Sequence, residues 1–310
     1  MLYNNITELV GKTPILKTNN FSKKEKINPF YAKLEAFNPA GSIKDRIALK
    51  MIEDAEKDGK LKVGDKIVEP TSGNTGIGIA AIGASKGYKV ILTMPESMSI
   101  ERRSIVLAYG AELVLTPASA GMNGAISKAK ELAEELNAFM PSQFENLSNP
   151  KAHYENTARE IWEDLDGKVD IFIAGIGTGG TISGVGKFLK EKNKDIKIFG
   201  IEPMDSPIIT KGKSGAHKIQ GIGAGFIPKT LDAKVYDEIF LVDNIEAMKA
   251  SSIFATTEGV LVGISSGAVL AVAKKVISRD EYKNKNIVVV LPDTGERYLS
   301  TELYNLPDSQ

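Results

Sequence analysis

The sequence predicts an α/β protein built from two open, doubly wound, mostly parallel sheets. Short apolar runs such as 66–69 and 287–291 alternate with helical stretches, a pattern typical of parallel sheets with helices on both faces. The alternation occurs in both halves of the 310 residues, a length that allows two substantial cores. No low-complexity linker separates the halves, so we expect two domains with a broad contact and a cleft between them.

Each half contributes its own series of elements. In the first half we expect strands at 30–34, 66–69, 90–94 and 112–115, and helices over 43–55, from about 76 to 86, over 100–108 and over 125–137. In the second half we expect strands at 169–174, 196–201, 238–242 and 287–291, and helices over 152–165, from about 181 to 192, over 245–257 and over 268–277. The glycine- and lysine-bearing segment 209–228 is predicted to be a long ordered loop.

The composition excludes several function classes. Lys+Arg and Asp+Glu both number 39, so no net charge favours nucleic acid or an anionic membrane as a partner. There is no apolar run near twenty residues, and the whole composition favours a cytoplasmic protein. The absence of cysteine excludes disulfides, thiolate metal sites and a catalytic thiol. His153 and His217 lack a metal-ligand spacing, so we expect no metal site.

Lys44 is the first candidate for chemistry. Asn38-Pro39 and Gly41 form a turn, and Ser42 with Asp45 approximates a capping box, which places Lys44 in the first turn of a helix. The positive end of the helix dipole disfavours its ammonium form, which suits a lysine that forms a Schiff base as a neutral amine. On this segment alone, a solvated lysine on an amphipathic helix is the alternative.

Two loops that follow strands and open helices are candidate anion receptors. Thr71–Gly76 offers hydroxyls, an amide and backbone N–H groups without a cation, which suits an exchanging substrate carboxylate. Gly177–Thr181 is a tighter glycine-rich cradle, which suits a permanently held phosphate. A capped strand–helix turn is the alternative for the first loop.

A different class of enzyme competes for the second loop. The run 175–180 satisfies G-x-G-x-x-G after a strand, and Glu202 ends the next strand, where a ribose-binding acid would lie. A nicotinamide-dependent dehydrogenase is therefore one alternative, and a ligand-binding module without catalysis is another. Neither explains the lysine in a first helical turn or the second anion receptor.

Five motifs taken together resemble the fold-type II pyridoxal-phosphate enzymes, whose fold is that of the tryptophan synthase β chain. The motifs are 38–46, 71–76, 177–181, Gly-Ile-Gly-Ala-Gly-Phe-Ile-Pro at 221–228 and Gly-Ile-Ser-Ser-Gly at 263–267. Within that group the chain is most similar to the cysteine synthase (O-acetylserine sulfhydrylase) family. The resemblance implies a smaller domain of 36–147 carrying the carboxylate loop and a larger one of 1–35 plus 148–310 carrying the phosphate loop, with pyridoxal 5'-phosphate in the cleft.

The resemblance also implies roles for individual residues. Lys44 would form the internal aldimine and act as general base, Asn74 would bond the ring hydroxyl, and Ser265 would face the pyridine nitrogen. The phosphate would be bound by Gly177, Thr178, Gly179, Gly180 and Thr181, and the substrate would be bound by Thr71, Ser72, Thr75, Gln143 and Gly221.

The implied reaction is β-replacement. O-acetyl-L-serine would lose acetate through an α-aminoacrylate intermediate, and sulfide would add to give L-cysteine. Cystathionine β-synthase-like activity and use of O-phosphoserine are the alternatives within the family. A homodimer is the family expectation, and a complex with serine acetyltransferase is a further partner that the resemblance raises. Ala120 and Asn123 stand where family members often carry lysines, which removes any electrostatic help from those lysines.

Overall fold

The computed structural model describes residues 1–71 and 73–305, which form two compact units. The first unit contains Met1–Gly11 and Asn38–Asn149, and the second contains Lys12–Phe37 and the described residues from Pro150 onward. The expected division placed residues 1–11 with the larger domain. They cluster with the first unit instead, because the Asn38 Oδ1 accepts the Gly11 N–H at 2.8 Å and the short helix η1 (Ile6–Leu9) packs against a helix of that unit.

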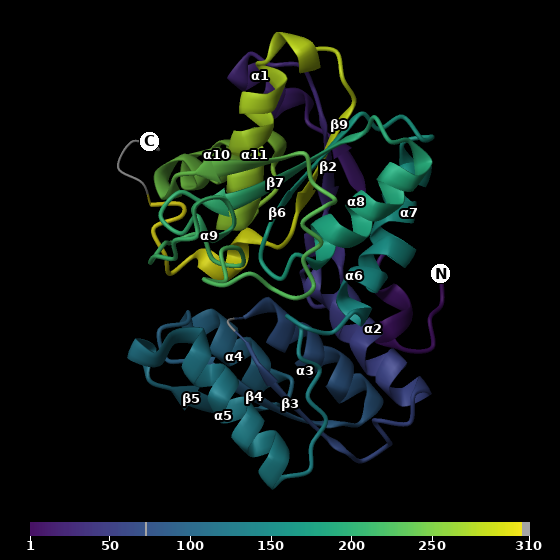
Figure 1. The fold of residues 1–310 in the computed structure, drawn as a ribbon, viewed down its shortest axis with the longest axis vertical. Helices are drawn as coiled ribbons and strands as arrows, with labels where there is room; N and C mark the ends of the chain where they lie inside the picture. The colour runs from purple at the N-terminus through teal and green to yellow at the C-terminus, as the bar shows by residue number, and fades with distance from the viewer. Residues whose placement is uncertain (72, 306–310) are drawn as a thin grey trace. The chain divides into compact units, whose positions relative to one another are not determined.

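The first unit is a parallel sheet with helices between its strands (Figure 1). Its elements after η1 are α2 (Lys44–Lys57), β3 (Lys66–Pro70), α3 (Asn74–Lys86), β4 (Lys89–Pro95), α4 (Ile100–Ala108), β5 (Glu112–Thr116), η3 (Ala118–Ala120) and α5 (Gly121–Glu135). The strand order is β3-β4-β5, and Phe139 bridges to Ile67 of β3 in parallel. The crossovers through α3 and α4 run one way along the sheet, and the crossover through α5 returns. Right-handed crossovers therefore place α5 on the opposite face, so the sheet is doubly wound.

The second unit holds the larger sheet (Figure 1). Its elements are β1 (Ile15–Lys17), α1 (Asn19–Glu25), β2 (Tyr31–Leu34), η2 (Glu35–Phe37), the π-helix η4 (His153–Thr157), α7 (Ala158–Asp164), β6 (Ile171–Gly175), α8 (Gly180–Lys192), β7 (Lys197–Pro203), α9 (Ile208–Lys211), β8 (Glu238–Val242), α10 (Asn244–Glu258), α11 (Ile264–Ile277), η5 (Asp280–Tyr282), β9 (Ile287–Leu291) and η6 (Gly295–Tyr298). Helix α6 (Ser148–Ala152) carries the chain from the first unit to the second.

The six strands of the larger sheet follow the order β1-β2-β9-β6-β7-β8. All neighbours are parallel except β1 and β2, which pair antiparallel at the edge. All five residues of β9 are buried, as expected for a central strand covered on both faces. Helix α11 packs on β9 and β6, and the side chains of Ala268, Val269, Leu270 and Val272 are fully buried. The predicted fold class, with two open, doubly wound, mostly parallel sheets, is confirmed.

Two of the differences from the predicted boundaries concern α11 and the segment 209–228. The helix expected to begin at Ala268 begins at Ile264, because Gly267 lets it approach α10 closely: a Cβ at Gly267 would lie 1.9 Å from the Ala247 carbonyl oxygen. The segment expected to be loop throughout 209–228 begins within the single-turn helix α9.

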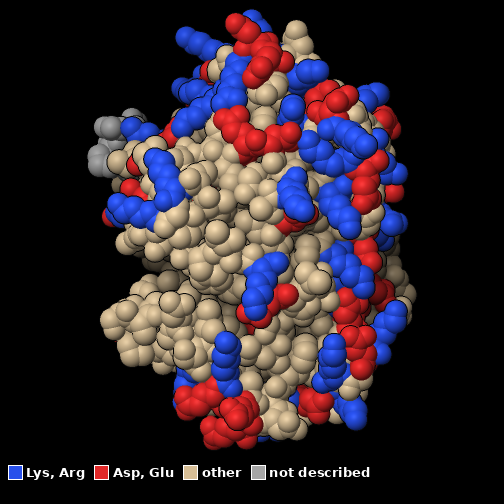
Figure 2. All heavy atoms as spheres, in the orientation of Figure 1, with Lys and Arg blue, Asp and Glu red and all other residues tan. Residues whose placement is uncertain are grey.

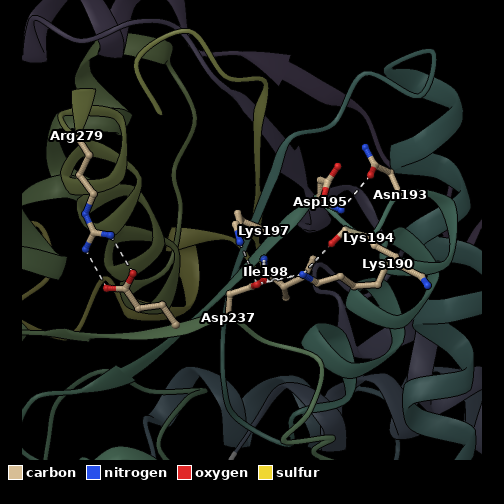
Figure 3. A network of polar contacts seen from close by, with 9 residues as sticks. Lys190, Asn193, Lys194, Asp195, Lys197, Ile198, Asp237 and Arg279 are labelled. Atoms are coloured by element: carbon tan, nitrogen blue, oxygen red, sulfur yellow. Dashed lines mark hydrogen bonds and ion pairs between the residues drawn. The ribbon is translucent and has the colours of Figure 1, made fainter. Parts of the chain in front are cut away.

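A polar cluster lies at the amino-terminal ends of the strands in the second unit (Figure 3). The Asp237 carboxylate accepts hydrogen bonds from Lys190 Nζ at 2.9 and 3.1 Å and from the Ile198 N–H at 2.8 Å, and Lys197 Nζ lies 3.5 Å away. Burial raises the pKa of Asp237, but the hydrogen bonds from Lys190 and Ile198 and the two lysine charges outweigh that effect. The pKa of Asp237 is therefore lowered.

Replacing Asp237 by Asn should reduce the free energy of unfolding at pH 7 by about 1 kcal/mol and leave the kinetic constants unchanged. A carboxyl whose pKa is lowered by folding stabilises above its unfolded pKa, so the deficit should begin to shrink as the pH falls below about 4 and should vanish only below the lowered folded pKa. Denaturant titrations of both proteins across pH 3 to 7 measure this. Asp195→Asn, at an exposed neighbour in the same cluster, is the matched control and should change little.

The surface and the helices add two observations. On the face drawn in Figure 2, Lys and Arg atoms are interspersed with Asp and Glu atoms and form no large field of one sign. Among the described residues, no helix is both long enough and apolar enough to cross a membrane.

Candidate functional site

Lys44 is the first residue of α2, as the sequence predicts. Its N–H donates to the Ser42 Oγ at 3.2 Å, and the Asp45 Oδ2 accepts the Ala40 N–H at 2.6 Å. Both side chains of the expected capping box therefore bind backbone N–H groups at the entry of the helix. The Lys44 side chain is half-buried, and a Cβ on Gly78 of α3 would lie 3.1 Å from the Lys44 carbonyl oxygen. Close packing of α2 on α3 thus fixes the backbone from which Lys44 projects.

The loop between β3 and α3 is organised by Thr71. Its buried Oγ1 accepts the N–H groups of Gly73 and Gly76, each at 3.0 Å. These two bonds are local and hold the loop in shape, so the structure gives Thr71 an organising function within its own loop. Ser72, a predicted substrate ligand, lies outside the described residues.

Thr75 and Gln143, which are 68 residues apart in sequence, meet in the first unit. The Thr75 Oγ1 donates to the Gln143 Oε1 at 2.6 Å, and the Gln143 Nε2 donates to the Pro70 carbonyl at 3.3 Å. Both side chains are buried. The structure therefore brings together Thr71, Thr75 and Gln143, three of the predicted carboxylate ligands.

Gly73 and Asn74 occupy the turn into α3. Gly73 has φ +154°, and a Cβ there would lie 2.4 Å from the Nε of Arg102, a side chain that is 2% exposed. Asn74 is the first residue of α3 and is half-buried. The 13-residue helix α3 therefore directs its N-terminal N–H groups towards the same turn that carries the predicted carboxylate ligands.

In the second unit, Gly177 and Gly179 shape the turn between β6 and α8. A Cβ on Gly177 would lie 2.3 Å from the Gly221 carbonyl oxygen, and one on Gly179 would lie 2.6 Å from the Cβ of Leu231. Gly179 also has φ +80°, a conformation that favours glycine. No other residue type fits either position without displacing the backbone or its neighbours.

Threonines line the same turn, which we call the cup (Gly177–Thr181). The Thr178 Oγ1 accepts the Gly180 N–H at 3.3 Å, and the Thr178 carbonyl accepts the Thr230 hydroxyl at 2.5 Å. Thr181 is half-buried, and its Oγ1 lies 3.3 Å from the His153 Nε2. The other ring nitrogen of His153 lies 3.0 Å from the Thr157 Oγ1 in the π-helix, so the imidazole is held between two hydroxyls.

Gly221 and Ser265 lie beside the cup in the second unit. A Cβ on Gly221 would lie 3.6 Å from the Ser265 Oγ, and the Gly221 carbonyl lies against Gly177. Ser265 is buried in the first turn of α11. The structure therefore groups all the predicted ligands that belong to the second unit: Gly177, Thr178, Gly179, Gly180, Thr181, Gly221 and Ser265.

Glu202 does not match the function that the dehydrogenase alternative requires of it. Its Oε1 accepts the N–H and the hydroxyl of Thr210 at 3.0 and 2.5 Å, and its Oε2 accepts the Ile209 N–H at 2.9 Å. The carboxylate is buried and caps α9. Both carboxylate oxygens of Glu202 are therefore already hydrogen-bonded to residues 209 and 210. The position of Glu202 at the end of a strand thus no longer supports binding of a nucleotide ribose.

Sequence reasoning missed several residues that support the site. They are Glu69, which binds the backbone of Gln143; Asn149, which donates to the Gln143 carbonyl at 2.8 Å; Arg102, which packs on Gly73; and His153, which contacts Thr181. One signal was available for Glu69: a carboxylate that ends a buried strand needs partners. For His153 the missed signal was its i, i+4 spacing to Thr157.

Comparison with known proteins identifies the family. The profile of the family described as "Pyridoxal-phosphate dependent enzyme" matches residues 6–293. The chain belongs to this pyridoxal-phosphate-dependent family. It is 54% identical over 305 residues to a cysteine synthase of Staphylococcus aureus, covering 98% of each chain.

Solved structures of this pyridoxal-phosphate-dependent family share the fold over the whole chain. A cysteine synthase of Entamoeba histolytica superposes with a TM-score of 0.95 at 43% identity, covering 99% of this chain and 92% of that one. An O-ureido-L-serine synthase gives a TM-score of 0.95 at 40% identity, covering 100% and 98%. The fold-type II assignment and the dependence on pyridoxal phosphate are therefore confirmed, whereas the fold alone does not specify the reaction.

The cup fits the phosphate of that cofactor. It combines threonine hydroxyls with the N–H groups of the first turn of the 13-residue helix α8, and Gly177–Thr181 contains no acidic side chain. Ser265 supplies a neutral hydroxyl beside it. These donors match a phosphate dianion and the nitrogen of a pyridine ring.

Proposed function

We propose that this protein is a cysteine synthase, which replaces the acetoxy group of O-acetyl-L-serine by sulfide and releases L-cysteine and acetate. The observation that carries the proposal is the similarity to a cysteine synthase over 98% of the chain, together with the anion-receptor residues that each unit groups. The division of labour between the receptors, with cofactor phosphate at the cup and substrate carboxylate at Thr71–Gly76, is part of the proposal.

The residues that would hold the cofactor follow from their chemistry. The cup would bind the phosphate, Asn74 the ring hydroxyl, Ser265 the pyridine nitrogen and Lys44 the aldehyde carbon. When bound, pyridoxal phosphate supplies an electron sink for the negative charge that develops at the substrate α-carbon. The predicted location in a cleft between the two domains stays a prediction.

The protein's own groups carry the proton and orient the substrate. The Lys44 Nζ, released as a neutral amine, takes the α-proton, and the C–O bond to acetate breaks with its electron pair leaving on the acetate oxygen. Sulfide then forms the new C–S bond, and the Lys44 Nζ returns a proton to the α-carbon. Thr75 and Gln143 hold the substrate carboxylate so that the bond to be broken is correctly oriented. With a hydroxyl at Ser265 in place of a carboxylate, the ring nitrogen of the bound cofactor would stay unprotonated, which would favour elimination over transamination.

The visible absorption of the purified protein, before and after O-acetylserine is added, tests the proposal together with product analysis. A yellow protein whose spectrum shifts with O-acetylserine, and which then forms cysteine and acetate in equal amounts with sulfide, is expected. A colourless protein that binds a nicotinamide nucleotide would overturn it. The homodimer, the serine acetyltransferase complex and the cytoplasmic location stay predictions.

The choice of leaving group gives a separate prediction. Phosphate departure needs a cation near the β-carbon, usually an arginine, and residues 210–228 contain none. The lysines of this segment precede Gly221, and the Lys218 Nζ lies 2.6 Å from Glu302 at the exposed surface. O-acetylserine should therefore exceed O-phosphoserine in kcat/KM by about 100-fold or more.

Specificity constants for the two donors, measured at moderate ionic strength, decide this point. Lys213→Met, which removes an exposed lysine of the same segment, controls for nonspecific attraction of phosphate and should leave the ratio unchanged. Equal or reversed constants would contradict the assignment of acetate as the leaving group.

A further inference from the structure

A buried carboxylate contacts the backbone of Gln143, one of the proposed ligands of the substrate carboxylate. Glu69, near the end of β3, is 0% exposed. Its Oε2 accepts the Ser142 N–H at 2.7 Å and its Oε1 accepts the Gln143 N–H at 2.9 Å. One side chain thus ties the end of β3 to a turn that lies more than 70 residues away in sequence.

The turn that Glu69 holds has an unfavourable backbone. Ser142 has φ +58°, in the left-handed region that residues with a Cβ seldom adopt. The consecutive N–H groups of Ser142 and Gln143 converge on one carboxylate, which is the arrangement of an anion-binding nest. The carboxylate therefore stabilises a conformation that the chain would otherwise disfavour.

The Gln143 side chain depends on this backbone for its orientation. Its Oε1 is bound by Thr75 and its Nε2 by the Pro70 carbonyl, while the Gln143 carbonyl accepts from Asn149. Rotation of the peptide at Ser142 would move the Gln143 backbone and break these bonds together. Glu69 is the ionisable group in this set of contacts, and its two carboxylate oxygens hold the Ser142–Gln143 turn by accepting its two N–H groups.

We propose that Glu69 is a positioning residue for the amino-acid substrate: it holds the Ser142–Gln143 turn and thereby aims the Gln143 amide at the substrate carboxylate without touching the substrate. This inference rests on the proposed function, because it takes Gln143 to bind the substrate carboxylate. A positive side chain would be the ordinary expectation near a receptor for a carboxylate. Glu69 is negative instead, and it acts by holding the Ser142 and Gln143 N–H groups in place.

Glu69→Gln is the informative substitution, because it removes the carboxylate charge and keeps the size of the side chain. Burial raises the pKa of Glu69 to about 7, although the N–H groups of Gln143 and Ser142 lower it. Burial and hydrogen bonding are thus opposed, and Glu69→Gln removes a buried charge while keeping the shape of the side chain. The variant should unfold at nearly the wild-type temperature, yet it presents an NH2 group to one of the two N–H donors and cannot accept both.

The experiment measures substrate kinetics of the holoenzyme. Glu69→Gln should raise the KM for O-acetylserine about tenfold, with a much smaller change in kcat and in cofactor content. Hydrogen exchange at the Ser142 and Gln143 amides should become faster in the variant than in the wild type. Glu56→Gln is the matched control, since Glu56 is a half-buried carboxylate of the same unit that binds Lys86 and Tyr88, and it should leave KM unchanged.

A double-mutant cycle separates positioning from a merely structural effect. In a Gln143→Ala background, Glu69→Gln should raise KM no further, because its effect passes through Gln143. Full additivity, or an unchanged KM in the single variant, would overturn the proposal while the wild type still makes cysteine. A wild type that makes no cysteine from any donor would instead overturn the proposed function, so the two failures are distinguishable.

Discussion

Lys44→Ala should reduce turnover of O-acetylserine with sulfide by at least about 1,000-fold, and the variant should hold pyridoxal phosphate without a covalent bond. The reason lies in the start of α2, where Lys44 follows a turn fixed by Ser42 and Asp45 and where the helix dipole disfavours an ammonium group. Under the proposed function, a neutral amine at this position would serve both as the covalent anchor and as the base for the α-proton. Alanine supplies neither function.

Two measurements check this expectation. Borohydride reduction followed by mass spectrometry detects the covalent bond in the wild type and should find none in the variant, and steady-state assays measure turnover. Lys50→Ala is the matched control, because Lys50 lies on the same helix and pairs with Asp54 at 3.3 Å. If Lys44→Ala keeps a tenth or more of the wild-type kcat, Lys44 is not the catalytic amine.

Substitution of Gly179 should have the second largest effect, and it should act on the cofactor. A Cβ at this position meets the Leu231 Cβ at 2.6 Å and the Leu231 Cα at 2.9 Å, and the backbone has φ +80°. Gly179→Ala must therefore displace the cup, and Gly179→Asp adds repulsion of the phosphate dianion. We expect the affinity for pyridoxal phosphate to fall about 100-fold in Gly179→Ala and further in Gly179→Asp.

Equilibrium binding of pyridoxal phosphate to the apoproteins measures this loss. Gly259→Ala is the matched control, since Gly259 has φ +73° but no atom within 4 Å of the added Cβ, so it reports the backbone effect alone. Thr75→Val should show the opposite behaviour, with cofactor retained and the KM for O-acetylserine raised. If both loops affect cofactor and substrate equally, the proposed division between them is wrong.

Local sequence patterns were sufficient to predict an element where the residues that flank it mark its two ends. The strand Ile287–Leu291 is a run of five apolar residues between Asn286 and Pro292, and the structure ends it at the predicted residues. The start of α11 was missed because Ser265, Ser266 and Gly267 read locally as a loop. Packing on α10, which only Gly267 permits, makes them helical. Tertiary contact overrode local preference there.

The site divides in the same way. The two glycine-rich turns were predictable because each follows an apolar strand and precedes a helix. Gln143 was assigned only through resemblance, since its contact with Thr75 joins positions that no local pattern connects. Glu69 was not predicted at all, because its partners are backbone N–H groups 73 and 74 residues away. Because nearly every residue type has a backbone N–H, the residue types at 142 and 143 do not indicate that Glu69 binds them.

The pairing of β2 with β9 has a consequence for biosynthesis. Residues 31–34 leave the ribosome long before their parallel neighbour Val288–Leu291, because Tyr31 and its partner Val288 are 257 positions apart. The antiparallel pair of β1 and β2, which α1 connects, therefore keeps the β2 edge unpaired while the nascent chain is extended through the intervening residues. The segment Asn38–Asn149, by contrast, is continuous and is complete long before. Such a long-range parallel pairing is slow to form, so the second unit should fold last and be the part that depends on protection from aggregation during synthesis.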